Sequence, residues 1–86
     1  MILALEPEFT ILTSLGKMYI VDGFSKSTNT VYEYLGNFWH GNPEEYGLDD
    51  INPINNKTFG ELYQRTIQKI MDLEAEGYKV VFEWGP

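Results

Sequence analysis

The chain has 86 residues, enough for one domain, with no cysteine and a single histidine. Disulfide frameworks, thiolate zinc sites and histidine-cluster metal sites are therefore excluded, and any bound metal must be a hard cation such as Mg²⁺, Mn²⁺ or Ca²⁺ held by oxygen atoms. The formal net charge of -7 argues against nonspecific nucleic-acid binding, because phosphate contacts need Lys and Arg and the chain has six of them.

No apolar run approaches the roughly 20 residues that span a bilayer, so no contact with a membrane is expected. Residues 1–5 are apolar, but they lack the basic residues of a secretory signal. We expect a protein that is not secreted and that works in the cytoplasm or inside a virus-infected host cell.

Two short runs in the first half of the chain predict β-strands. Residues 18–23 (M-Y-I-V-D-G) are rich in β-forming side chains, and residues 30–35 (T-V-Y-E-Y-L) form a second such run. The polar, turn-forming residues 24–29 lie between them, so the two strands should pair as a β-hairpin.

Glu33 is the unusual residue of the second predicted strand. Alternation along a strand places Val31, Glu33 and Leu35 on one face and the side chains between them on the other. An acid flanked by two apolar residues on the same face must lie near a strand end, be neutralised, or bind a cation.

The second half of the chain predicts a long loop and then a helix. Glycine, proline and asparagine punctuate residues 36–57, and a loop of this length in a small domain is usually functional or mobile. Thr58 and Glu61 have the spacing of a helix capping box, and Gly77 is a natural helix end. One apolar stripe at helical spacing consists of Phe59, Leu62, Thr66, Ile67, Ile70 and Leu73. The opposite, polar side consists of Gln64, Arg65, Gln68, Lys69 and Asp72.

Residues 78–84 (Y-K-V-V-F-E-W) predict a final strand. A strand that is reached through a helix should pair in parallel with the strand before it, by a right-handed crossover. The order of elements therefore predicts a minimal α/β core, in which a small mixed sheet is built from a β-hairpin and a parallel strand.

Three residues could form a catalytic site: Asp22 at the end of one strand, Glu33 on the next, and His40 just beyond it. Two carboxylates at one end of a sheet can hold a Mg²⁺ ion and leave positions for water and a phosphate oxygen. A neutral histidine nearby can accept the proton of that water. The flat rings of Phe38 and Trp39 can wedge between bases or stack on them. The pattern alone leaves the alternative open: surface carboxylates, a solvated histidine and core aromatics.

Several strings of residues carry a resemblance to a known family. Residues 19–24 (Y-I-V-D-G-F) precede residues 28–43 (T-N-T-V-Y-E-Y-L-G-N-F-W-H-G-N-P), and T-F-G-E-L-Y at 58–63 and G-Y-K-V-V-F-E-W at 77–84 follow. Over residues 17–84 this order resembles the very-short-patch-repair (Vsr-like) branch of the PD-(D/E)XK endonuclease superfamily, in the versions found in large DNA viruses, phages and mobile elements.

The resemblance implies a restriction-endonuclease-like core and a role for each residue of the site. Asp22 matches the metal-binding aspartate, Glu33 falls at the acidic position of the following strand, and the backbone near Tyr34 would also face the metal. His40 matches the histidine that assists the attacking water. Glu8 is a further acid that could correspond to one at the edge of the site.

Phe38 and Trp39 match aromatic residues that enter DNA in the repair enzymes, and we expect Asn42 to contact DNA beside them. The chain also departs from the family. The closing strand of the family ends in Trp-Glu and continues, whereas Trp84 here is followed by glycine and proline, and the zinc ligands of the repair enzymes are missing. We therefore expect one nuclease-type domain over residues 1–86, shortened at both ends.

The first functional hypothesis is a Mg²⁺- or Mn²⁺-dependent DNA endonuclease that hydrolyses or nicks a phosphodiester bond. The alternative is a catalytically inactive module of the same fold that binds DNA or protein, favoured by the acidic net charge and the small size. A homodimer or a larger protein partner is also open, because a short chain with edge strands and many aromatic residues can bury them by association.

Overall fold

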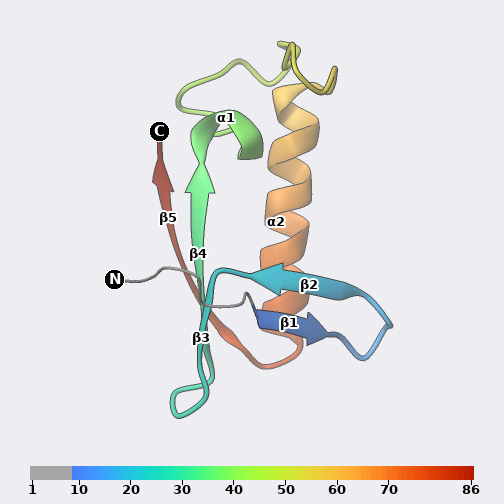
Figure 1. Ribbon diagram of the computed structural model, residues 1–86. Coiled ribbons are helices and arrows are strands. Elements are labelled where there is room, and N and C mark those ends of the chain that lie inside the picture. The colour runs from blue at the N-terminus through green and yellow to red at the C-terminus, as the bar shows by residue number, and fades with distance from the viewer. Residues whose placement is uncertain (1–8) are drawn as a thin grey trace.

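Residues 9–86 are described by the computed structural model, and they form two small sheets and one long helix (Figure 1). The elements in chain order are β1 (Phe9–Leu12), β2 (Met18–Val21), β3 (Gly23–Ser25), β4 (Thr30–Gly36), α1 (Asn37–His40), α2 (Phe59–Ala75) and β5 (Lys79–Gly85). β1 and β2 pair antiparallel, and the second sheet has the order β3-β4-β5. The predicted α/β class is confirmed. Within residues 9–86, no helix has the length and apolar character needed to cross a membrane.

The predicted hairpin between residues 18–23 and 30–35 forms only in part. β3 pairs antiparallel with β4, with Phe24 opposite Val31, but residues 18–21 pair with β1 in the other sheet. The chain changes sheets at Asp22, which lies between β2 and β3. Glycine follows Asp22, and the fully buried side chain of Val21 precedes it, so the strand divides where the core requires the chain to turn.

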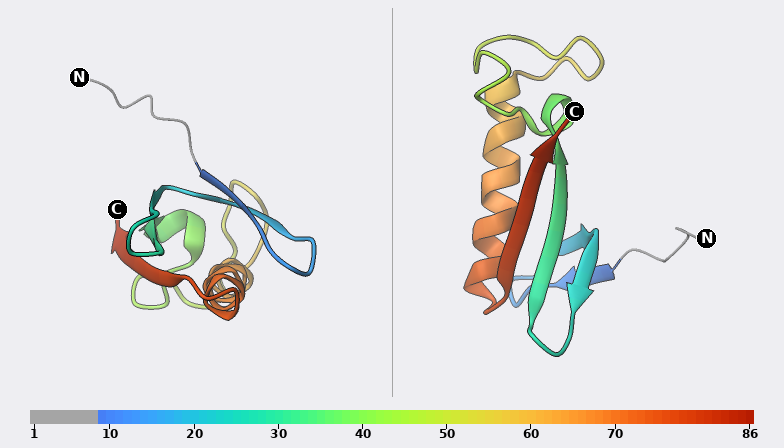
Figure 2. Two further views of the ribbon diagram at one scale, coloured as in Figure 1. Left: turned by 90° about the horizontal axis from the view of Figure 1, so that it is seen from below. Right: turned by 90° about the vertical axis from the view of Figure 1, so that its left-hand side faces the viewer.

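The bounds of α2 and the pairing of β5 agree with the predictions from the sequence. The Thr58 hydroxyl accepts a hydrogen bond from the Glu61 backbone N–H at 3.0 Å, and α2 ends two residues before Gly77. Five of the six residues of the predicted apolar stripe are buried, and Ile67 is half-buried. β5 runs parallel to β4, with Tyr32 opposite Val81. α2 lies along one face of the β3-β4-β5 sheet (Figure 2). β3 and β5 are the two edge strands of that sheet.

The core lies between α2 and the two sheets. Its buried centre consists of Ile11, Val21, Val31 and Leu73, and half-buried Tyr19, Phe24, Tyr78 and Val80 pack around it. Full burial of an aliphatic side chain of this size contributes about 1.5–3 kcal/mol relative to exposure. Because this core takes residues from both sheets and from α2, it fixes how the end of β2 lies against β4 and the helix.

The predicted loop of residues 36–57 is more structured than expected, because residue 36 ends β4 and residues 37–40 form α1. Asn52 holds the remaining part of the loop in place by hydrogen bonds. Its side chain is fully buried, donates to the Phe38 carbonyl at 3.1 Å and accepts from the Ile54 N–H at 2.8 Å. The rings of Phe38, Tyr46 and Phe59 also pack together, with 4.2 Å between the centroids of the last two. The loop is thereby tied to the start of α2.

Candidate active site

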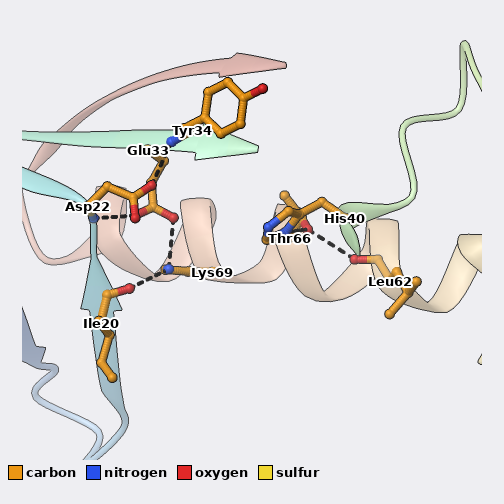
Figure 3. Close-up of polar contacts among 8 residues, drawn as sticks. All are labelled: Ile20, Asp22, Glu33, Tyr34, His40, Leu62, Thr66 and Lys69. Carbon is orange, nitrogen blue, oxygen red and sulfur yellow. Dashed lines mark hydrogen bonds and ion pairs between the residues drawn. The ribbon is translucent and has the colours of Figure 1, made fainter. Parts of the chain in front are cut away.

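Asp22 is held against β4 by one hydrogen bond to Glu33 and one to the backbone of Tyr34. The Asp22 backbone N–H donates to Glu33 Oε1 at 3.0 Å, and Asp22 Oδ2 accepts from the Tyr34 N–H at 2.7 Å (Figure 3). Asp22 is exposed at the junction of the two sheets, whereas Glu33 is 8% exposed in the middle of β4. The two residues lie together as expected, but not at the end of the sheet as the sequence predicted. They meet at the Asp22 bend between the sheets, beside the middle of β4.

Lys69 of α2 neutralises the buried carboxylate. Its Nζ donates to Glu33 Oε2 at 2.8 Å and to the carbonyl oxygen of Ile20 at 2.6 Å (Figure 3). The side chains of Lys69 and Glu33 are 23% and 5% exposed. Breaking a buried ion pair by removing one partner typically costs about 3–5 kcal/mol, since the other charge is left unpaired. Of the three outcomes expected for an acid on an apolar face, Glu33 thus shows neutralisation, by Lys69.

The sequence prediction placed Lys69 on the polar side of the helix, and that placement was wrong. Lys69 follows Leu62 by seven residues and Thr66 by three, and it precedes Leu73 by four, so it lies within the apolar stripe itself. A lysine in an apolar helix stripe and a glutamate in an apolar strand face satisfy each other when the two faces pack. That combination was the signal available in the sequence.

His40, the last residue of α1, is held by Thr66 of α2. His40 Nδ1 lies 3.1 Å from Thr66 Oγ1, and the Thr66 hydroxyl donates its hydrogen to the Leu62 carbonyl at 3.0 Å. Because that hydroxyl has one hydrogen, its oxygen accepts from His40 Nδ1–H. We assign the tautomer on this network, and it leaves the Nε2 lone pair free to accept a proton. A side chain at Gly41 would collide with the Phe59 carbonyl, so glycine is required for α1 to lie this close to α2.

The environment of His40 favours its neutral form. Partial burial is the largest influence and lowers the pKa of the imidazole below its usual value of 6.5, and the positive charge of Lys69 lowers it further. The carboxylates of Glu33 and Asp22 raise it, but they do not outweigh the burial. His40 is therefore uncharged at neutral pH, as a general base must be.

Two clefts open beside these residues. The first, of about 290 Å³, is lined by both carboxylates and by residues of β3, β4 and β5, namely Gly23, Tyr32, Tyr34, Val81, Phe82 and Glu83. The second, of about 320 Å³, contains His40 and is lined by Tyr19, Trp39, Leu62, Arg65, Thr66 and Lys69. His40 does not share a cleft with the two carboxylates. Lys69 joins the two groups, because it contacts Glu33 and lines the His40 cleft.

The oxygen atoms of this site suit a hard divalent cation at Asp22. Mg²⁺ is usually held by one or two carboxylates and keeps several waters. Asp22 is exposed, and of its two carboxylate oxygens only Oδ2 accepts a hydrogen bond from residues 9–86. Both oxygens of Glu33 accept hydrogen bonds, so Glu33 would bind a metal by exchanging one of them. Over the described part of the chain, no three His, Cys, Asp or Glu side chains form a metal-binding group.

The remaining predicted residues have different surroundings. Trp39 is 54% exposed, whereas Phe38 is half-buried in the aromatic cluster of the loop. The buried Asn42 donates to Asn37 Oδ1 at 2.9 Å and accepts from the Glu44 N–H at 3.0 Å. Its amide therefore stabilises the loop through internal hydrogen bonds. Glu8 lies outside the described residues.

Gly85, which follows Trp84, leaves room for the side chain of Tyr34. The Tyr34 hydroxyl lies where a side chain of Gly85 would begin, and it donates to the Pro86 carbonyl at 3.1 Å. The end of β5 is thus shaped to fit a tyrosine from β4.

Comparisons with protein-family models, with curated proteins and with solved structures found no match for this chain. The class that the structure defines is a small mixed α/β fold with two sheets and one long helix. A carboxylate pair, a lysine and a histidine are arranged along one side of that helix.

Proposed function

We propose that the protein is a metal-dependent DNA endonuclease with a restriction-endonuclease-like core, which hydrolyses or nicks a phosphodiester bond. The observation that carries the proposal is the pairing of Asp22 with Glu33 beside Lys69, which also lines the cleft that contains His40. A hairpin, a long helix and a parallel strand in this order agree with the resemblance of the sequence to Vsr-like nucleases.

Asp22, Glu33 and the backbone near Tyr34 would hold Mg²⁺ or Mn²⁺, which supplies a more acidic water and stabilises charge on the phosphate. The Tyr34 N–H fixes the Asp22 carboxylate through Oδ2 and leaves Oδ1 for a ligand. His40 accepts the proton of the attacking water at Nε2, which its hydrogen bond to Thr66 leaves unprotonated.

The His40 cleft would bind the DNA backbone. Arg65 and Lys69 bring positive charge to this cleft, and phosphate oxygens prefer such donors. Trp39 forms part of its wall and is exposed, so its ring is free to stack on a base. Lys69 also contacts Glu33, so it would link a phosphate bound in this cleft to the carboxylate pair.

The test is cleavage of supercoiled plasmid in Mg²⁺ or Mn²⁺. We expect the wild type to nick it, and Asp22→Asn and His40→Gln to lower the rate about 100-fold or more, since a positioned general base alone contributes about 10²–10⁴-fold. Asp49→Asn, the same change at an exposed acid of the loop, is the matched control and should leave the rate unchanged. Equal rates for wild type and Asp22→Asn would contradict the proposal.

The second candidate is a catalytically inactive module that binds DNA or protein. The observation that favours it is the occupation of both Glu33 oxygens by internal donors, together with the net charge of -7. Calorimetric titration with Mn²⁺ separates the two. Micromolar binding that is lost in Asp22→Asn supports the enzyme, and no heat of binding in either protein supports the inactive module.

A further inference from the structure

β5 is an edge strand whose outer side has no partner strand within residues 9–86. The sheet order places β4 on one side of β5 only, and β5 lies at the margin of the sheet in Figures 1 and 2. The backbone N–H and C=O groups that point away from β4 can therefore pair with another strand. β5 has seven residues, which equals β4 as the longest strand of the described chain.

The side chains of β5 are arranged symmetrically about Val81. Val81 and Phe82 are 42% and 43% exposed, which is high for apolar residues of a strand. Lys79 and Glu83 are exposed two positions to either side of Val81, and neither makes an ion pair with any residue from 9 to 86. Lys79, Val81 and Glu83 share the open face of the sheet, because their β4 partners are Thr30, Tyr32 and Tyr34.

We propose that β5 pairs antiparallel with β5 of a second copy of this chain, about a two-fold axis at Val81. In this register Lys79 of each copy faces Glu83 of the other, and Val80 faces Phe82. Both pairs of charges are opposite in sign, and both pairs of apolar residues become covered. The two three-stranded sheets join into one sheet of six strands.

This symmetry identifies the strand that pairs with β5 as β5 of a second copy of the chain. Charges on an edge strand normally prevent pairing, because most registers bring like charges or a charge and an apolar residue together. Here the sequence K-V-V-F-E is complementary to itself when it is reversed, a property that favours the pairing of β5 with a second β5. The inference does not depend on the proposed nuclease function.

Exchange of the two charges tests the pairing. Lys79→Glu places Glu opposite Glu twice in each dimer, and Glu83→Lys places Lys opposite Lys. We expect each variant to raise the dimer dissociation constant about tenfold or more, since directly opposed like charges are destabilising. A mixture of the two variants, and the double variant Lys79→Glu/Glu83→Lys, should recover the wild-type constant because every pair is again opposite in sign.

Sedimentation velocity over a concentration series measures these constants. Lys26→Glu and Glu74→Lys make the same charge changes at exposed positions away from β5 and should leave the constant near that of the wild type. Circular dichroism establishes that each variant is folded. A wild type that stays monomeric to millimolar concentration would overturn the proposal, and so would a double variant that dimerises no better than the single ones.

A cross-link tests the register without relying on the charges. The chain has no cysteine, so Val81→Cys introduces one thiol at the two-fold axis. Oxidised glutathione should convert this variant to a covalent dimer on a non-reducing gel. Lys79→Cys should cross-link far less, because the two thiols would lie about 13 Å apart along the strands, beyond the reach of a disulfide. Equal cross-linking of the two variants would contradict the register.

Discussion

At the scale of single residues, the buried Glu33 is the centre of the candidate site. A carboxylate on a side chain that is 5% exposed needs a partner, and it has two: the Asp22 N–H and the Lys69 ammonium. Lys69 in turn also bonds the Ile20 carbonyl, so one side chain of α2 connects both sheets. The same contacts thus stabilise the fold and place the carboxylate that the proposed chemistry uses.

Replacement of Lys69 should therefore destabilise the protein strongly. Lys69→Met leaves the Glu33 charge buried and unpaired, and we expect the free energy of unfolding to fall by about 3 kcal/mol, the lower end of the usual range because the lysine is 23% exposed. Lys17→Met is the matched control, since its ion pair with Asp72 lies at the surface, and it should cost much less. Urea denaturation measures both, and adding Glu33→Gln to Lys69→Met should recover part of the loss.

The lowered pKa of His40 predicts how stability depends on pH. Burial disfavours the imidazolium in the folded chain, so the unfolded chain binds more protons between the lowered pKa and the ordinary value of 6.5. We expect the free energy of unfolding to fall as the pH is lowered through this interval and to be unaffected by His40 above it. Chemical denaturation from pH 8 to 5 should show a difference in slope between wild type and His40→Gln, and identical slopes would contradict the assignment.

At the scale of elements, local signals placed α2 and tertiary contacts placed the strands. The capping residue Thr58 and the apolar stripe define the helix within the sequence of α2 itself. The run of β-forming residues 18–23 gave no sign that Asp22 would divide it, because the division comes from β1, which pairs with β2 from outside that run.

The cap of α2 makes a prediction at this scale. Thr58→Ala removes the oxygen that accepts from the Glu61 N–H at 3.0 Å, and we expect a loss of about 1 kcal/mol of stability. Thr58→Ser keeps the hydroxyl and should retain most of it. Thermal unfolding of the three proteins measures the effect, and equal destabilisation by Ala and Ser would show that the hydrogen bond is not its source.

At the scale of the whole molecule, the net negative charge restricts the proposed DNA binding to one cleft. The chain has six basic residues, and two of them, Arg65 and Lys69, line the same cleft as His40. Binding would therefore rest on few phosphate contacts in a molecule whose overall charge repels DNA.

Few contacts predict a weak dependence of DNA binding on salt. With two phosphates neutralised, the slope of log K against log salt concentration should be about -2, and Arg65→Gln should reduce it by about one. Fluorescence anisotropy of a labelled duplex at several NaCl concentrations gives the slope. A value steeper than about -4 would mean that a surface other than the His40 cleft carries the binding.

By itself, the sequence determined the α/β class, the bounds of α2, the parallel pairing of β5 and the closeness of Asp22 to Glu33. The bounds of α2 follow from a capping residue and helical spacing, and the other features follow from the order of the strands and the helix along the chain. Only the tertiary structure decided that Lys69 turns toward Glu33, and that His40 binds Thr66 and opens on a separate cleft. Those contacts join residues 26 and 36 positions apart, and they exist because α2 packs against α1 at Thr66 and reaches β4 at Lys69, two juxtapositions that no local pattern contains.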